Sequence, residues 1–114
     1  VITVDCGSSN TDAVAYGNSL GIETIITDHH TLPEKHPPSV ALLHPHRGKK
    51  TDSTWDLTGA GVAFFLAKAL LEKEFSQEKC TSMVEQLLEL AVLGTVADVG
   101  SLRGQNRIIT ALGL

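Results

Sequence analysis

The stretch Ile25-Ile26-Thr27-Asp28-His29-His30 decides the fold, because an apolar run ends there abruptly in one carboxylic acid and two imidazoles. β-Branched residues followed directly by polar ones are typical of a buried strand that ends in a loop. The start of the chain repeats this pattern, since Val1-Ile2-Thr3-Val4 leads to Asp5. Open α/β sheets bind ligands at the carboxyl ends of their strands. If the two strands are parallel neighbours, we therefore expect Asp5 and Asp28-His29-His30 to meet in one crevice.

The residues between these two strands predict a helix. Asn10, or one of the serines before it, can cap a helix over residues 11–20, and Gly21 suits the left-handed position that ends it. With a second strand over residues 22–27, this is a β-α-β unit, which is almost always parallel. A third strand is expected over residues 39–43 and leads into His44-Pro45-His46-Arg47.

The second half of the chain predicts helices. Thr58 can cap a helix over residues 59–75, whose apolar start implies burial and whose two early glycines permit close backbone packing. Two more helices are expected over residues 81–93 and 106–111. The inward-facing residues of the helix over 81–93 should be Met83, Leu87, Leu88, Leu90 and Ala91. The predicted fold class is therefore α/β, a parallel sheet flanked by helices over residues 1–47, followed by a mainly helical portion over residues 58–114.

The composition is that of a soluble globular domain, with 114 residues of which 42% are hydrophobic and 19% charged. The most apolar stretch, residues 59–71, contains Lys68 and is too short for a bilayer, so we expect no membrane association. Two cysteines do not suggest a disulfide scaffold, which favours a cytoplasmic location. The net charge of -4 means that a polyphosphate substrate would need metal ions or basic surface elsewhere in a longer protein. Because the chain opens inside a strand, we expect it to be a piece of such a protein.

The polar residues at the strand ends predict a divalent-metal site. Imidazole and carboxylate together suit Mn²⁺, Fe²⁺, Zn²⁺ or Mg²⁺. Two such ions about 3.5–4 Å apart can polarise a phosphoryl oxygen and stabilise the leaving oxygen. No nucleophile elbow, His-Glu-x-x-His or Cys-x-x-Cys motif competes with this interpretation.

Simpler structural roles remain open for the same residues. Asp5 could cap the helix that follows it, Asp98 could cap the segment after it, and Asp28-His29-His30 could be a solvated loop. His44-Pro45-His46-Arg47 is more typical of a solvated loop than of a phosphate clamp. Cys6 is expected to be a small buried residue rather than a nucleophile.

Several motifs together resemble the DHH phosphoesterase superfamily, and within it the RecJ-type single-stranded-DNA exonucleases. They cover nearly the whole chain in the family's order: Ile2-Thr3-Val4-Asp5-Cys6-Gly7, Ile26-Thr27-Asp28-His29-His30 with Leu32-Pro33, Leu57-Thr58-Gly59-Ala60-Gly61-Val62-Ala63-Phe64, Leu93-Gly94-Thr95-Val96-Ala97-Asp98-Val99, Gln105-Asn106-Arg107 and Gly113-Leu114. The Gly-x-Gly-Val-Ala-Phe and Leu-Gly-Thr-Val-Ala-Asp-Val segments are the most specific of these.

The resemblance implies a site for two ions, usually Mn²⁺ or else Mg²⁺, that cleaves phosphodiesters. By motif, Asp5 would bridge both ions, His29 and Asp98 would complete one of them, Asp28 would support the cluster, and His30 would contact the scissile phosphate. RecJ-type enzymes consume single-stranded DNA from its 5′ end in repair and recombination. Substrate contacts are then expected from the remaining polar residues after the third strand, His44, His46 and Arg47.

The resemblance also implies parts that this chain lacks. The family's first motif, an Asp-rich segment on an earlier strand, and the DNA-binding domain are not among the 114 residues, so the fragment alone is expected to be inactive. His44-Pro45 stands where the family usually has Asn-Pro. Two alternatives stay open: a DHH phosphodiesterase acting on short oligonucleotides or cyclic dinucleotides, and a non-catalytic scaffold that binds replication or repair proteins. Intact Asp5, His29 and Asp98 argue against a scaffold.

Overall fold

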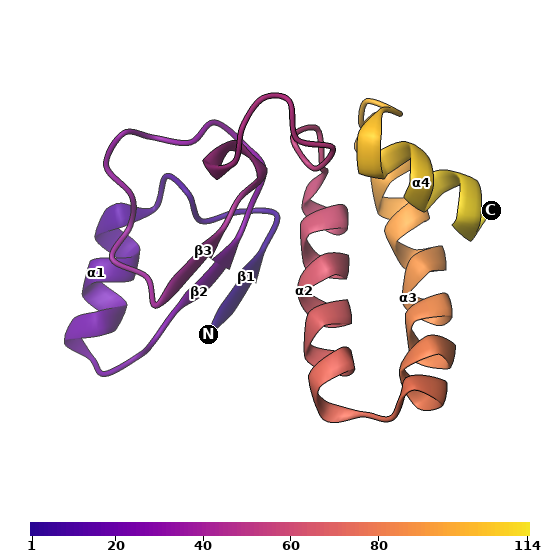
Figure 1. Ribbon diagram of the computed structural model, residues 1–114. Helices are drawn as coiled ribbons and strands as arrows, with labels where there is room; N and C mark the ends of the chain where they lie inside the picture. Colours follow the sequence, from indigo (N-terminus) through magenta and orange to yellow (C-terminus); the bar gives the residue numbers. More distant parts are fainter.

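The structure, a computed structural model, describes all 114 residues and is built around a three-stranded parallel sheet in the order β1-β2-β3 (Figure 1). The strands pair in register, with Ile2 opposite Ile25 and Ile25 opposite Ala41. The elements in chain order are β1 (Ile2–Val4), α1 (Thr11–Ser19), β2 (Ile25–Thr27), β3 (Ala41–Leu43), a 3-10 turn (Pro45–Arg47), α2 (Gly59–Glu74), α3 (Gln77–Ala97) and α4 (Gly104–Gly113). The predicted fold class is confirmed.

The sheet lies between α1 on one side and the group of α2, α3 and α4 on the other (Figure 1). Ile26, at the centre of β2, is fully buried, and Val14 is the buried residue of α1. β2 reaches β3 through residues 28–40, where three prolines prevent a helix. The sheet therefore presents all three carboxyl ends at one edge.

The strands are shorter than predicted. β2 begins at Ile25 and not at Ile22, because the backbone N–H of Ile22 donates to the carbonyl of Gly17 and closes the end of α1. β3 begins at Ala41 rather than at residue 39. The predicted Asn10 cap makes no side-chain hydrogen bond, and α1 ends at Ser19.

The helices form the main hydrophobic core. As predicted, Thr58 caps α2, and its hydroxyl accepts from the N–H of Gly61 at 3.2 Å. The prediction for α3 was wrong at both ends, since the helix runs from Gln77 to Ala97, and Leu90 is exposed rather than inward. The core cluster consists of Leu57, Val62, Phe64, Ala91, Val92 and Ile109.

By length and composition, α3 could cross a membrane, since it has 21 residues and a mean hydropathy of 1.3 over its most apolar window. The sequence pattern predicted a shorter helix that ends before Gly94, so a helix of this length was not expected. Mostly buried core helices of soluble proteins pass the same test; here 22% of the window is buried, and α3 packs between α2 and α4.

Candidate metal centre

The three strand ends bring their next residues to one place. β1, β2 and β3 end in register and are followed by Asp5, Asp28 and His44. The backbone N–H of Asp5 donates to the carbonyl of Thr27 at 2.9 Å, and that of Asp28 donates to the carbonyl of Leu43 at 3.1 Å. These hydrogen bonds continue the ladder one residue beyond the strands, so the spacing of the three side chains is set by the sheet itself.

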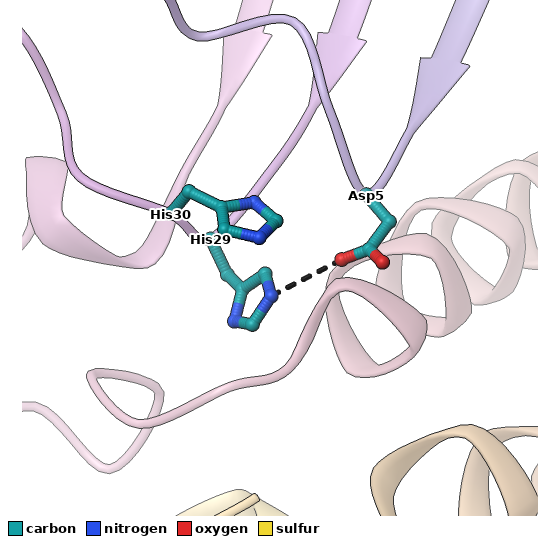
Figure 2. A group of neighbouring side chains, drawn as sticks. All are labelled: Asp5, His29 and His30. Atoms are coloured by element: carbon teal, nitrogen blue, oxygen red, sulfur yellow. Dashed lines mark ion pairs between the residues drawn. The ribbon is translucent and has the colours of Figure 1, made fainter. Parts of the chain in front are cut away.

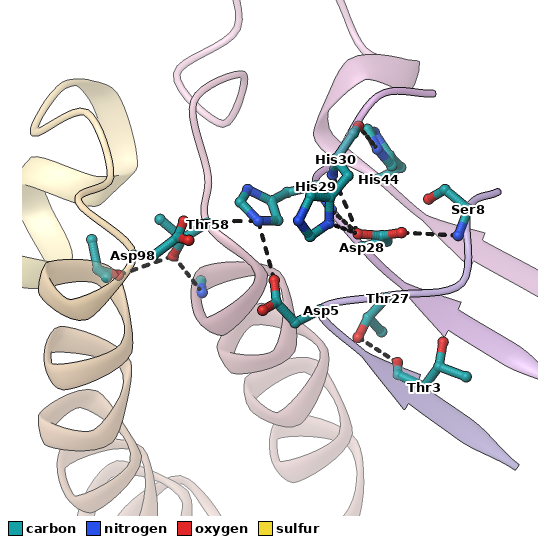
Figure 3. A network of polar contacts seen from close by, with 12 residues as sticks. Thr3, Asp5, Ser8, Thr27, Asp28, His29, His30, His44, Thr58 and Asp98 are labelled. Carbon is teal, nitrogen blue, oxygen red and sulfur yellow. Dashed lines mark hydrogen bonds and ion pairs between the residues drawn. The ribbon is translucent and has the colours of Figure 1, made fainter. Parts of the chain in front are cut away.

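Asp5 and Asp98, which are far apart in the sequence, both face His29. The Nε2 atom of His29 lies 3.1 Å from Oδ1 of Asp5 and 3.7 Å from Oδ2 of Asp98. Figure 2 shows the Asp5 carboxylate and the His29 ring pointing toward each other from neighbouring strands, and Figure 3 shows Asp98 approaching from the end of α3. The structure thus brings together the three residues that the sequence analysis grouped as metal ligands.

The donor atoms fit a divalent cation. Nε2 of His29 is buried and has no hydrogen bond, although carboxylate oxygens lie close on two sides. Donor atoms of Asp5, His29 and His30 all lie within 4.8 Å of one another, so they can reach one ion. An unpaired imidazole nitrogen between carboxylates matches the ligand preference of Mn²⁺ and its neighbours.

Asp5 adopts a backbone conformation that aims its side chain. Its φ of 63° is in the left-handed region, which Asp tolerates better than most residues. The side chain then lies against the first turn of α2, where a Cβ on Gly59 would collide with the Asp5 carboxylate. Because Gly59 has no side chain, the Asp5 carboxylate fits against the helix. The close packing predicted for the early glycines of α2 is therefore found at Gly59, and its partner is Asp5.

Asp28, in contrast to Asp5, is buried and saturated with hydrogen bonds (Figure 3). Its Oδ2 accepts from the N–H of Ser8 at 2.8 Å, and its Oδ1 accepts from the N–H of His29 at 2.8 Å and of His30 at 3.2 Å. The Nδ1 atom of His30 lies 2.7 Å from Asp28 Oδ1. Asp28 therefore fixes the loop and the His30 ring, and no oxygen of it points at the Asp5–His29–Asp98 group.

The protonation of Asp28 and His30 follows from the hydrogen bonds that they make. Burial alone would raise the pKa of the Asp28 carboxyl, but the hydrogen bonds from His30 and Ser8 outweigh burial and hold it well below its usual range. The hydrogen bond to Asp28 raises the pKa of His30 above its ordinary value, and burial opposes this shift. With Nδ1–H donating to Asp28, the Nε2 atom of the exposed His30 ring is free for a substrate.

Asp98 reaches His29 because α3 packs closely on the start of α2. A Cβ on Gly94 would meet the Cβ of Ala60 at 2.5 Å, so the two helices touch where Gly94 lies. The hydroxyls of Thr58 and Thr95 are 3.1 Å apart and both are buried. These contacts hold the carboxyl end of α3, and with it Asp98, beside the edge of the sheet.

His44 is buried, contrary to the predicted solvated loop, and its ring nitrogens are not free for a substrate. Nε2 lies 2.8 Å from the carbonyl of His30, and Nδ1 accepts from the N–H of His46 at 3.1 Å. This pattern requires a neutral ring that donates through Nε2, and burial lowers the pKa of His44. Both ring nitrogens of His44 are thus engaged within the chain, and the ring positions the backbone of His30.

The residues after His44 lie nearer to solvent. Arg47 is exposed, and its guanidinium donates to the carbonyl of Leu42 at 2.9 Å. The His46 ring stacks on Trp55, a contact that the sequence did not predict. The one tryptophan of the chain, close in sequence to two histidines, was the available signal. Cys6 is exposed, so the prediction of a buried residue was wrong.

A family model described as the DHH family, N-terminal domain, matches residues 1–95, which include the Asp5–His30 segment at the site's centre. The chain belongs to the DHH family. Its similarity extends along its full length to part of the single-stranded-DNA-specific exonuclease RecJ of Bacillus subtilis, with 39% identity over 114 residues, 100% of this chain and 13% of that protein. The RecJ of Thermus thermophilus is 40% identical over 113 residues, 99% of this DHH chain and 16% of the relative.

Solved structures agree with these sequence comparisons. The crystal structure of Thermus thermophilus RecJ in complex with Mn²⁺ matches 98% of this chain with a TM-score of 0.81 and 36% identity, and the match covers 16% of that structure. The DHH chain therefore spans less than a quarter of the length of these RecJ relatives.

Proposed function

We propose that this chain supplies part of the two-metal catalytic domain of a manganese-dependent exonuclease that degrades single-stranded DNA from its 5′ end. The observation that carries the proposal is the buried Nε2 atom of His29, which has no hydrogen bond and lies between carboxylates from two distant segments. The names of the relatives support DNA as the substrate, and the bound ion of a solved relative supports Mn²⁺. The proposal includes that the full-length protein acts in DNA repair in the cytoplasm.

Each residue of the centre then has a distinct task. Asp5, His29 and Asp98 would hold an ion, and bound divalent ions supply polarisation of the phosphoryl group and stabilisation of the leaving oxygen. Asp28 holds the His30 ring through Nδ1, and the opposite ring nitrogen contacts an oxygen of the scissile phosphate. The remaining ligands of the second ion would come from a part of the protein outside these 114 residues.

The surface beside His30 favours a long strand over a small closed ligand such as a cyclic dinucleotide. Two open hollows of about 420 Å³ and about 640 Å³ are both lined by His30 and Thr31. Because the two hollows lie on either side of these shared residues and both are open, we propose that a chain of nucleotides passes His30 in both directions.

The test is nuclease activity of the natural full-length protein. His29→Ala and Asp98→Ala are each expected to reduce the rate of Mn²⁺-dependent cleavage of single-stranded DNA on the order of 10³-fold, because each removes a ligand. His36→Ala is the matched control, since His36 is an exposed histidine in the proline-rich loop. Near wild-type rates in the first two variants would refute the metal assignment. Substrates labelled at either end test polarity, since label released first from the 3′ end contradicts the proposal.

A further inference from the structure

An aromatic stack lies beside the candidate metal centre. The His46 and Trp55 rings are 4.4 Å apart between centroids, and their planes differ by 24°. His46 also forms one wall of the hollow of about 640 Å³, whose lining residues are His29, His30, Thr31, Leu32 and His46. Trp55 stacks on the His46 ring and is not among the residues that line the hollow.

This stack is tied to the residue that faces the substrate. The N–H of His46 donates to the buried ring of His44, and that ring donates in turn to the carbonyl of His30. The His44 ring also contacts His46 edge-on, with centroids 5.1 Å apart. His46 is thus held at a fixed place relative to His30 by two hydrogen bonds in series.

The loop that carries the stack also begins with a run of cationic residues. Arg47, Lys49 and Lys50 follow His46 within four residues, although the chain as a whole has a net charge of -4. All three are exposed. Cations that attract phosphates, combined with an aromatic surface on which bases stack, are the usual features of surfaces that bind single-stranded nucleic acid.

We propose that the His46–Trp55 stack is a platform for a nucleobase, and that the base of the nucleotide next to the scissile phosphate lies on His46 in this hollow. The inference rests on the proposed function, which supplies the substrate. His46 contacts the base, and Trp55 is a positioning residue that supports the His46 ring. Because bases within a duplex already have both faces stacked, such a platform accepts only unpaired bases, and it tolerates every sequence because each base has a π-face.

The experiment uses the natural full-length protein with Mn²⁺ and a set of single-stranded DNAs, each lacking one base at a successive position from the end that is cleaved. In the wild type, kcat/KM is expected to fall about tenfold when the missing base is the one on the platform. His46→Leu keeps the bulk of the side chain but has no aromatic ring. Its kcat/KM on intact DNA should be about tenfold below that of the wild type, and it should fall no further on the abasic DNA. His46→Phe should behave like the wild type on both substrates, and His36→Ala is the control.

Two results would overturn the platform while leaving the proposed function in place. One is a folded His46→Leu variant that cleaves intact DNA at the wild-type rate. The other is the same abasic penalty in His46→Leu and in the wild type, since the base would then be recognised elsewhere. A wild-type protein that fails to cleave single-stranded DNA with Mn²⁺ refutes the proposed function itself, and the platform with it.

Discussion

Asp28 and Asp5 occupy equivalent positions, one residue past the end of neighbouring parallel strands, yet their surroundings are opposite. Asp28 is 2% exposed and accepts hydrogen bonds from three backbone N–H groups and one ring nitrogen. The side chain of Asp5 is 56% exposed and faces the unpaired nitrogen of His29. The difference teaches that a saturated carboxylate organises a site, whereas an unsaturated one is left to bind a ligand.

The largest expected effect is on the stability of the folded chain, which should depend on Asp28 much more than on Asp5. Asp28→Ala should lower the free energy of unfolding of the 114-residue chain by about 3 kcal/mol, because it leaves several buried donors without an acceptor. Asp5→Asn should change it by less than about 0.5 kcal/mol, because no hydrogen bond is lost and Asn, like Asp, tolerates the left-handed backbone at this position. Urea unfolding followed by Trp55 fluorescence measures both. Equal losses in the two variants would contradict the distinction.

A second comparison uses two glycines that lie inside helices. Gly59→Ala places a methyl group where the Asp5 carboxylate lies, so we expect Mn²⁺ affinity of the full-length protein to fall at least about tenfold. Gly17→Ala in α1 meets only ordinary contacts at 3.8 Å and serves as the control. The change at Gly17, within α1, favours helix formation by about 1 kcal/mol, and the change at Gly59, the first residue of α2, favours it less. Titration calorimetry should separate them, and equal affinities would show that Asp5 does not bind the ion.

The turn after Asp98 offers a change that should stabilise the chain. The N–H of Gly100 donates to the carbonyl of Thr95 and that of Val99 to the carbonyl of Val96, which is the helix-ending pattern that usually places glycine where Val99 stands. Val99 has a φ of 54°, a strained value for a β-branched residue. Val99→Gly should therefore raise the unfolding free energy by about 1 kcal/mol. A loss of stability would show that the side chain of Val99 matters more than its backbone strain.

The smallest expected effect concerns pH and His44. Because burial lowers the pKa of His44 in the folded chain, the unfolded chain takes up the proton first as pH falls. The contribution of neutral His44 to stability is thus complete above the ordinary pKa of 6.5 and is lost as pH falls through the lower folded pKa. His44→Asn removes this titration, so its unfolding free energy should decline less than that of the wild type between about pH 7.5 and about pH 5. Unfolding free energies can be measured with urea at each pH. If those of the wild type and of His44→Asn decline equally, a group other than His44 causes the pH dependence.

The sequence predicted the fold and the group of polar residues because both depend on local patterns. A β-branched run followed by Asp or His marks the end of a strand, and parallel pairing then places Asp5 beside Asp28 and His29. Thr58 followed by an apolar run marked the start of α2 equally well. The same patterns did not predict where Asp98 lies relative to the sheet. Asp98 was predicted as a metal ligand only from the family resemblance.

What the sequence did not predict depends on contacts between distant segments. Gly94 suggested the end of a helix, but it lies inside α3 because its missing side chain lets that helix touch Ala60. His44 looked like a loop residue, and only the carbonyl of His30 explains its burial. The stack of His46 on Trp55 also joins residues whose spacing matches no regular period.

The group of Asp5, His29 and Asp98 joins the edge of the sheet to the carboxyl end of α3, whereas the six buried residues of the core cluster all belong to the helical portion of the chain. A cation held there would act as a clasp between two halves of the domain. Thermal melting should then register metal loading directly. An ion at about 100 times its dissociation constant adds about 2.7 kcal/mol to the folded state.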